Sequence, residues 1–262
     1  MAKKETKNSP KDLIEALPEE VAALEKDVVV AEELKVLEKA EVKEDKKGIA
    51  GWSPKTKLGK EVKEGKEKNI DSIIESGKKI LESEIADFLL NLESDLLLVG
   101  QAKGKFGGGK RRAWRQTQKK TQEGNIITFA SMAVVGDKNS HVGVGYGRAK
   151  ETLPAREKAL RNAKLNIIKI VRGFESPETE KDFSDPHTVP YKVEGKCGSV
   201  RITLIPAPRG TGLVVGDEAK KILKLAGIKD VYGITKGQTR TTFNLAKACI
   251  DALQKTTKIK TK

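Results

Sequence analysis

The stretch GKFGGGKRR at residues 104–112 places groups that could hold phosphate at the spacing of a nucleotide-binding loop. Gly104, Gly109 and Lys110 match the pattern G-x-x-x-x-G-K-[ST] in every position but the last. That last position needs a hydroxyl group to coordinate Mg²⁺, and here it is Arg111, which cannot bind a cation. A nucleotide site is therefore the weaker interpretation of this stretch.

A flexible basic arm that binds a polyanion is the stronger interpretation. Eight basic residues and no acidic one lie between Lys103 and Lys120. The four glycines within 104–109 give the backbone freedom, which costs entropy to lose unless binding offsets that cost. We expect a hinge that carries a basic clamp for phosphates, and a solvated charged loop is the remaining alternative.

The charge of the chain favours a polyanionic partner. Among 262 residues, 51 are Lys or Arg and 37 are Asp or Glu, so the net charge is +14. The first 100 residues carry 18 Lys, no Arg and 23 acidic residues, so the excess of positive charge lies in the rest of the chain. Arg binds phosphate through a planar fork of donors, which makes nucleic acid the first candidate.

Metal, disulfide and membrane sites are not expected. Cys197 and Cys249 lie far apart in apolar patterns, which predicts buried thiols rather than a zinc site or a disulfide. The N-terminus lacks the apolar core of a secretory signal, and no apolar run approaches the roughly 18 residues of a membrane span. We therefore expect a cytoplasmic protein with no cofactor.

The first part of the chain predicts little folded structure before residue 70. Residues 1–69 mix Lys with Glu and hold few apolar residues, which is typical of a charged, largely disordered extension. From Ile70 to Leu89, apolar residues recur at three- and four-residue steps. This period predicts a helix or a pair of helices.

Two β-rich runs and a helix follow. Residues 125–137 and 141–149 predict strands, and DKNS at 137–140 predicts a tight hairpin turn in which Asn139 can adopt a positive φ. Residues 151–171 predict a helix, because small and aliphatic residues recur along one face.

Gly143, Gly145 and Gly147 alternate along the second of these strands. Their spacing does not match the G-x-G-x-x-G pattern of a dinucleotide site. Alternate glycines remove the side chains from one face of a strand, so another backbone can come close. Two interpretations stay open, namely close approach of an RNA strand and tight packing of a helix on the sheet.

The remainder of the chain predicts a second, smaller α+β domain at 188–262, after an acidic linker at 173–187. Its expected elements are strands at 189–195, 198–207 and 229–235, a loop at 208–212, and helices at 216–227 and 241–255. The whole chain is therefore predicted to be α+β, with a first domain at 70–172 that carries the basic insertion 103–115.

The order of the motifs resembles a known family. Residues 114–255, which include VVGDKNSHVGVGYGRAKE, PHTVPYKVEGKCGSV and PAPRGTG, resemble the fifth protein of the ribosomal small subunit. PHTVP, GKCGSV and PAPRGTG are similar to its archaeal and eukaryotic branch, and we favour an archaeal source. The resemblance implies an N-terminal domain like a double-stranded-RNA-binding fold and a C-terminal domain of split β-α-β type, here preceded by the long charged extension.

The resemblance also implies a role without enzymatic activity, as a constituent of the small ribosomal subunit that supports translational accuracy. The implied partners are small-subunit rRNA, the fourth and eighth small-subunit proteins, and messenger RNA near the channel through which it enters. A loop at 116–125 would extend toward the decoding region, but Glu123, Gly124 and Asn125 stand where the family has a Gly pair and an Arg. The competing hypotheses are a nucleotide hydrolase and an RNA chaperone that acts apart from ribosomes.

The candidate site residues combine this resemblance with the basic residues of the chain. We expect no catalytic and no metal-binding residue. By resemblance, Gly212 and Lys220 lie near the fourth small-subunit protein. The expected RNA contacts are Arg111, Arg112, Arg115, Lys119, Lys120, Gly124, Asn125, Lys138, Asn139, Gly143, Gly145, Gly147, Arg148, Lys150, Arg209, Thr211 and Arg240.

Overall fold

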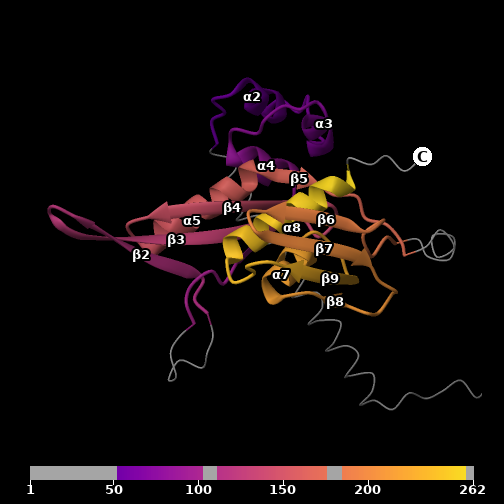
Figure 1. Ribbon diagram of the computed structural model, residues 1–262. Coiled ribbons are helices and arrows are strands. Elements are labelled where there is room, and N and C mark those ends of the chain that lie inside the picture. Colours follow the sequence, from indigo (N-terminus) through magenta and orange to yellow (C-terminus); the bar gives the residue numbers. More distant parts are fainter. Residues whose placement is uncertain (1–51, 103–110, 176–184, 258–262) are drawn as a thin grey trace, which may run out of the picture. The chain divides into compact units, whose positions relative to one another are not determined.

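The computed structural model describes residues 52–102, 111–175 and 185–257 (Figure 1). Residues 104–110 of the predicted hinge at 104–114 and most of the predicted N-terminal extension lie outside the described residues. Contacts divide the chain into two units, Met1–Trp52 and Ser53–Lys262, and the described helices and strands all belong to the second unit. This unit contains both helices and two sheets, which confirms the predicted α+β class.

Three short helices precede the first sheet, α2 (Lys57–Lys63), α3 (Ile70–Glu75) and α4 (Ser83–Leu89). The Thr56 side chain caps α2 by accepting a hydrogen bond from the Gly59 amide. Val62 is fully buried, and the Glu82 carboxylate accepts hydrogen bonds from the amides of residues 55 and 56. The prediction of disorder up to residue 69 is therefore wrong for α2, whereas the expected helix pair corresponds to α3 and α4.

The first sheet contains β1 (Glu93–Leu96), β2 (Trp114–Thr121), β3 (Gly124–Gly136), β4 (His141–Ala149) and β5 (Ile167–Lys169). All of its pairings are antiparallel, in the order β1-β3-β4-β5, and β2 pairs with the first part of the long β3. The expected loop at 116–125 is therefore wrong, because β2 and β3 form a projecting hairpin with a turn at residues 122 and 123 (Figure 1). Polar cross-strand pairs such as Thr117 and Thr128, whose hydroxyl groups lie 2.9 Å apart, hold this hairpin.

The turn between β3 and β4 lies at residues 137–140, as predicted. The Asp137 Oδ1 atom accepts hydrogen bonds from the amides of Asn139, Ser140 and His141 at 2.8, 3.0 and 2.9 Å. The residue with positive φ is Lys138, at 60°, and not Asn139 as expected. The Asp137 carboxylate stabilises this geometry, because it satisfies three amides that the tight turn leaves without strand partners.

Helix α5 (Thr152–Leu165) packs directly on the backbone of β4. A Cβ atom built on Gly145 would lie 2.1 Å from both the Ala159 oxygen and the Ala163 nitrogen. Cβ atoms on the neighbouring glycines would meet α5 in the same way, at 2.2 Å from the Ala163 oxygen for Gly143 and from the Ala155 oxygen for Gly147. Tight helix packing is therefore the correct interpretation of Gly143, Gly145 and Gly147, and RNA contact at these glycines is wrong.

Helix α5 is shorter than the sequence analysis predicts. It ends at Leu165, and the following residues form β5, which pairs with the start of β4. Ile167 and Ile168 are β-branched residues, which favour a strand where a neighbouring strand can pair with them.

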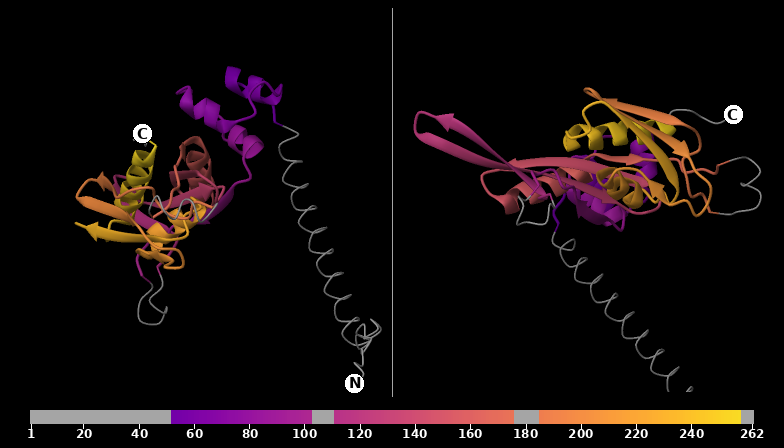
Figure 2. Two further views of the ribbon diagram at one scale, coloured as in Figure 1. Left: turned by 90° about the vertical axis from the view of Figure 1, so that its right-hand side faces the viewer. Right: turned by 60° about the horizontal axis from the view of Figure 1, so that its bottom comes forward.

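The second sheet contains β6 (Val193–Cys197), β7 (Val200–Pro206), β8 (Leu213–Val214) and β9 (Val231–Lys236), in the order β6-β7-β9-β8. Strands β8 and β9 are adjacent and parallel, and α7 (Asp217–Leu225) connects them. This is a β-α-β unit with no strand between its two strands, so the expected split arrangement is wrong in that detail. Helix α8 (Thr242–Thr256) lies along the face of β6 and β7 (Figure 1, Figure 2).

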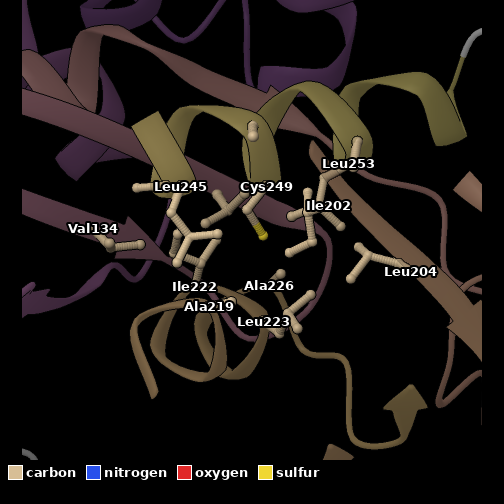
Figure 3. Packing of buried hydrophobic residues seen from close by; sticks show 14 of the residues in the cluster. Val134, Ile202, Leu204, Ala219, Ile222, Leu223, Ala226, Leu245, Cys249 and Leu253 are labelled. Atoms are coloured by element: carbon tan, nitrogen blue, oxygen red, sulfur yellow. The ribbon is translucent and has the colours of Figure 1, made fainter. Parts of the chain in front are cut away.

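One apolar core joins the two sheets. Figure 3 shows Cys249 and Leu253 of α8 pointing toward Ile202 of β7, with Val134 of the first sheet close to Leu245. The same cluster includes residues of α7 and of β4, so the two predicted domains are packed on each other. Burial raises the pKa of Cys249 to about 12, so this thiol stays protonated, in agreement with the predicted buried cysteine.

Partly buried polar contacts also connect α7 to the first half of the unit. The Glu218 carboxylate on α7 accepts a hydrogen bond from the Leu98 amide at 2.9 Å. Burial raises the pKa of Glu218, and this hydrogen bond opposes the rise. Lys221 contacts the Asp95 carboxylate at 3.0 Å and the Leu96 oxygen at 2.8 Å. These contacts attach α7 to the segment around β1.

We expect Gly145→Ala to lower the free energy of unfolding of the isolated protein by about 3 kcal/mol, because the new methyl group overlaps backbone atoms of α5 that cannot move independently. Urea unfolding of both proteins measures the difference. Gly216→Ala is the matched control, since its Cβ would meet no atom within 4 Å and its φ is −61°. Losing this helix N-cap glycine should cost at most about 1 kcal/mol. A Gly145→Ala protein as stable as the parent would contradict the packing described here.

Candidate nucleic-acid interface

Three of the predicted RNA contacts meet in one cavity. Arg111 precedes β2, Arg115 lies on β2 and Arg240 precedes α8, and all three line a cavity of about 700 Å³. Residues 99–102 and 241–244 complete its lining, and none of the lining residues is acidic. Along the chain, Arg111 and Arg240 are separated by more than half the length of the second unit. Only the packing of the two sheets brings them together.

The N-terminus of α8 contributes to the same cavity. Thr241, Thr242, Phe243 and Asn244 line it, and the first turn of α8 contains no acidic residue. The N-terminal end of a helix carries a partial positive charge, which favours a bound anion. Together with three guanidinium groups, this makes the arginine cavity, defined by Arg111, Arg115 and Arg240, a site suited to phosphate.

A basic stripe continues from the arginine cavity onto the projecting hairpin. Arg115 and Arg148 both neighbour Ala130 in the register, so their side chains share one face of the sheet. Arg148 donates hydrogen bonds from Nε and Nη2 to the Thr128 hydroxyl at 3.2 and 2.8 Å. Lys119 lies farther out on the same face of β2. Neighbouring strand residues point to opposite faces, so Lys120 points to the other side.

Arg112 and Trp114 lie together on the face opposite to Arg115. The Arg112 guanidinium lies 4.9 Å from the centre of the Trp114 ring, a cation–π distance. Trp114 also packs edge-on against Phe129, with 5.3 Å between ring centres. Trp114 is therefore engaged within the protein, which leaves less of its ring open to a base.

A second cavity, of about 470 Å³, brings together residues that the sequence analysis assigned to different partners. Lys138, expected to bind RNA, and Lys220, expected to lie near a protein, both line it. Leu213, next to Gly212, lines it as well. Glu93 pairs with Lys138, so this cavity is less electropositive than the arginine cavity.

The loop at 208–212 is held by a buried pair of residues that the sequence analysis missed. The Asp230 Oδ1 atom accepts a hydrogen bond from the Gly212 amide at 2.7 Å, and its Oδ2 atom lies 2.9 Å from His187 Nδ1. Both side chains are buried. Arg209 is exposed and Thr211 is half-buried on the same loop. The available signal was a His that comes shortly before one predicted strand and an Asp at the start of another.

A second buried histidine, His141, also escaped the sequence analysis. Its Nδ1 atom lies 2.7 Å from Asp137 Oδ2 and its Nε2 atom lies 2.9 Å from Asp71 Oδ1. Burial by itself lowers the pKa of His141, but hydrogen bonds with Asp137 and then Asp71 outweigh it and raise that pKa. Burial likewise opposes ionisation of Asp137, whereas its hydrogen bond with His141 favours ionisation. The hydrogen bonds of Asp137 outweigh burial, so its pKa lies well below the usual range. The network ties α3 to the β3–β4 turn.

The other predicted contacts are exposed but do not gather in a cavity. Gly124 and Asn125 lie at the β2–β3 turn, Asn139 lies in the β3–β4 turn and Lys150 follows β4. Among the described residues, no group of three or more His, Cys, Asp or Glu side chains could hold a metal ion. No helix in the described ranges is long and apolar enough to cross a membrane.

We expect Asp230→Ala to lower the free energy of unfolding by about 3 kcal/mol, because it leaves the buried His187 ring and the Gly212 amide without their partner. The Gly212 amide should then exchange faster with solvent, as measured by hydrogen exchange. Asp217→Ala is the control, since that side chain is 92% exposed. Unchanged exchange at Gly212 would show that Asp230 does not hold the loop.

The His141 network should also make stability depend on pH. Because the folded-state pKa of His141 is raised above its ordinary value of 6.5, its charged form adds stability below pH 6.5, and this contribution is lost as pH rises through the folded-state pKa. His141→Gln should therefore destabilise the protein more at about pH 6 than at about pH 9 in urea unfolding. In the same experiment, Asp71→Asn should reduce the difference between the effects of His141→Gln at the two pH values, because Asp71 is one of the two carboxylates that raise the pKa of His141. Equal losses at both pH values would rule out a charged His141.

Comparisons with known proteins agree on one family. The sequence model described as Ribosomal protein S5, N-terminal domain, matches residues 113–171, and that of the C-terminal domain matches residues 195–262. The chain is 50% identical over 213 residues to small ribosomal subunit protein uS5 of Nanoarchaeum equitans, which covers 81% of this chain and 90% of that protein. It is 47% identical over 212 residues to uS5 of Hyperthermus butylicus, covering 80% and 92% of the two chains. The uS5 protein of Aeropyrum pernix is 46% identical over 209 residues, covering 79% and 88%.

Proposed function

Because this chain belongs to the uS5 family of small-subunit ribosomal proteins, in its archaeal type, we propose that it binds small-subunit rRNA chiefly through the arginine cavity and the basic stripe beside it. The chain is a structural, non-enzymatic constituent of the small ribosomal subunit and is located in the cytoplasm as part of the ribosome. This family membership excludes the competing nucleotide hydrolase.

The arginine cavity is the observation that carries the proposal. Arg111, Arg115 and Arg240 place three guanidinium groups around a space lined by the positive end of α8 and by no carboxylate. Like charges repel one another, so this arrangement is most stable when an anion lies among them. A phosphate group accepts paired hydrogen bonds from Arg, and rRNA supplies phosphates at regular intervals.

The fold supports the finer parts of the proposal. In the first sheet, α5 covers one face of antiparallel strands, an arrangement compatible with a double-stranded-RNA-binding-like domain. Arg148, Lys119 and Arg115 on the opposite face could then follow the phosphates of a structured RNA. The exposed Arg209 and Arg112 remain proposed contacts, as do Lys120, Lys138 and Lys150 and the polar positions Gly124, Asn125, Asn139 and Thr211.

We also propose the protein and messenger RNA contacts of this family for the chain. Lys220 is exposed on α7, and Gly212 lies in the loop held by Asp230. The cavity that Lys220 shares with Lys138 offers charged groups of both signs, which suits a protein surface that lies beside the RNA contact proposed for Lys138. We assign this region to the fourth small-subunit protein, and the eighth protein and messenger RNA near the channel where it enters are further proposed partners.

The salt dependence of RNA binding tests the arginine cavity. Binding of the full chain to an archaeal small-subunit rRNA transcript should weaken steeply with salt, because each neutralised phosphate releases counterions. Changing Arg111, Arg115 and Arg240 together to Gln should reduce the slope of log K against log salt by about 2. The measurement is filter binding or fluorescence anisotropy over a salt series.

A matched control separates the cavity from general charge. Lys79, Arg161 and Lys229 are exposed on three separate segments, and changing them together to Gln removes the same charge. This control should keep the slope close to that of the parent chain. Equal slopes for the cavity variant and the control would reject the cavity as the binding site, and absence of the chain from purified small subunits after sedimentation would reject its assembly into them.

A further inference from the structure

The outer face of the second sheet carries a row of three cations. The register pairs Lys196 of β6 with Arg201 of β7, and Arg201 with Lys236 of β9. Paired residues share one face of a sheet and their strands lie about 4.8 Å apart, so the three side chains stand directly beside one another. All three are exposed.

This face is the one that the helices leave uncovered. A Cβ atom on Gly195 would lie 2.0 Å from the Ala248 oxygen, so the side of β6 that holds Gly195 faces α8. Lys196 is the next residue along the strand and therefore points to the other side. Ile202, next to Arg201, is fully buried, which gives the same orientation for β7.

The cation row makes no ion pair within the described part of the chain, although the exposed Glu194 lies on the same face two residues before Lys196 and the Asp251 carboxylate accepts a hydrogen bond from the Lys196 amide at 3.0 Å. The ion pairs found among the described residues involve none of the Lys196, Arg201 and Lys236 side chains. Like charges directly opposite each other destabilise a sheet. A row of three is therefore a cost to the folded chain, which one neighbouring carboxylate reduces only in part and an external polyanion would remove.

A row that contains Glu194 and Ile234 lies next to the cation row on the same face, and an apolar and aromatic row lies beyond it. Ile205 of β7 pairs with Tyr232 of β9, which pairs with Val214 of β8. Tyr232 is 40% exposed, and Val214 and Ile234 are each 50% exposed. Exposed aromatic rings on an open sheet are suited to stacking with unpaired bases, because every base offers a flat face.

The cation row also adjoins the arginine cavity along the chain. Lys236 ends β9, and Arg240 lines the cavity four residues later. Gly237 lies against the β6–β7 turn, since a Cβ atom on it would lie 2.0 Å from the Ser199 oxygen. The loop between Lys236 and Arg240 therefore packs against the end of the sheet at which the cation row lies. A strand of RNA leaving the arginine cavity could continue from there onto the outer face.

We propose that the outer face of the second sheet is a second RNA-binding surface, which holds the phosphates of a single-stranded RNA segment on Lys196, Arg201 and Lys236 and stacks a base on Tyr232. The proposal rests on the proposed rRNA binding for the identity of its ligand. A cationic row favours a polyanion over a protein here, because a protein surface complementary to it would have to present a matching line of carboxylates.

The test compares three forms of the full chain in binding to a short oligouridylate, which has phosphates and bases but no duplex. The outer-face variant changes Lys196, Arg201 and Lys236 to Gln, and the control changes Lys79, Arg161 and Lys229 to Gln. We expect the outer-face variant to lose at least tenfold in affinity and to lower the salt slope by about 2, because single strands contribute about 0.7 per phosphate. The control should stay within about twofold of the parent chain. A cooperative thermal unfolding transition in each of the three forms would show that all three are folded.

Tyr232 offers an independent measurement. Tyr232→Phe keeps the ring and should bind the oligouridylate like the parent chain, whereas Tyr232→Leu should lose about tenfold in affinity. Equal binding by the outer-face variant and the control would overturn the proposal. So would a defect that appears only when other ribosomal proteins are added to the RNA, because the face would then be a protein interface. Failure of the parent chain to bind rRNA at all would instead count against the proposed function.

Discussion

The close packing of the two sheets on one apolar core is the constraint on which the described structure depends. Backbone approaches at this junction leave no room for side chains, since a Cβ on Gly136 would lie 2.3 Å from the Leu225 oxygen and one on Gly227 would lie 2.0 Å from the Lys138 oxygen. The Lys138 amide also donates a hydrogen bond to the Leu225 oxygen at 2.9 Å. The β3–β4 turn therefore sits against the end of α7, and this contact fixes the position of each sheet relative to the other.

The electrostatic properties of the protein follow from this packing. The core holds Arg240 of one half beside Arg111 and Arg115 of the other, although their mutual repulsion opposes it. The apolar cluster that spans both sheets supplies the free energy that offsets this repulsion. Two buried pairs, His187 with Asp230 and His141 with Asp137, act differently. Each pair satisfies the hydrogen-bonding groups of its own side chains and holds a loop or a turn in position.

Hydrophobic period and residue type predicted much of the second unit. The strands β3 and β4, the helices α5, α7 and α8, and their order were all predictable, because each buries one face against the core. Helix α2 was not, since Val62 and a glycine are its only buried residues and Lys and Glu surround them. The β2–β3 hairpin was missed for a related reason, because both of its faces are largely polar where it projects and cross-strand pairing replaces burial.

The sequence by itself determined the net charge, the separation of Arg from the acidic first part, and the order of motifs that identifies the uS5 family. Only the tertiary structure decided which of the cations meet. Gly145 could have faced RNA or a helix, and Lys196, Arg201 and Lys236 show no relation along the chain until the register of three strands aligns them. The physical reason is that the periodicity of apolar residues indicates whether a side chain is buried, but not which residues it contacts. Those contacts depend on packing between distant segments, and the separation of two segments along the chain does not determine their separation in space.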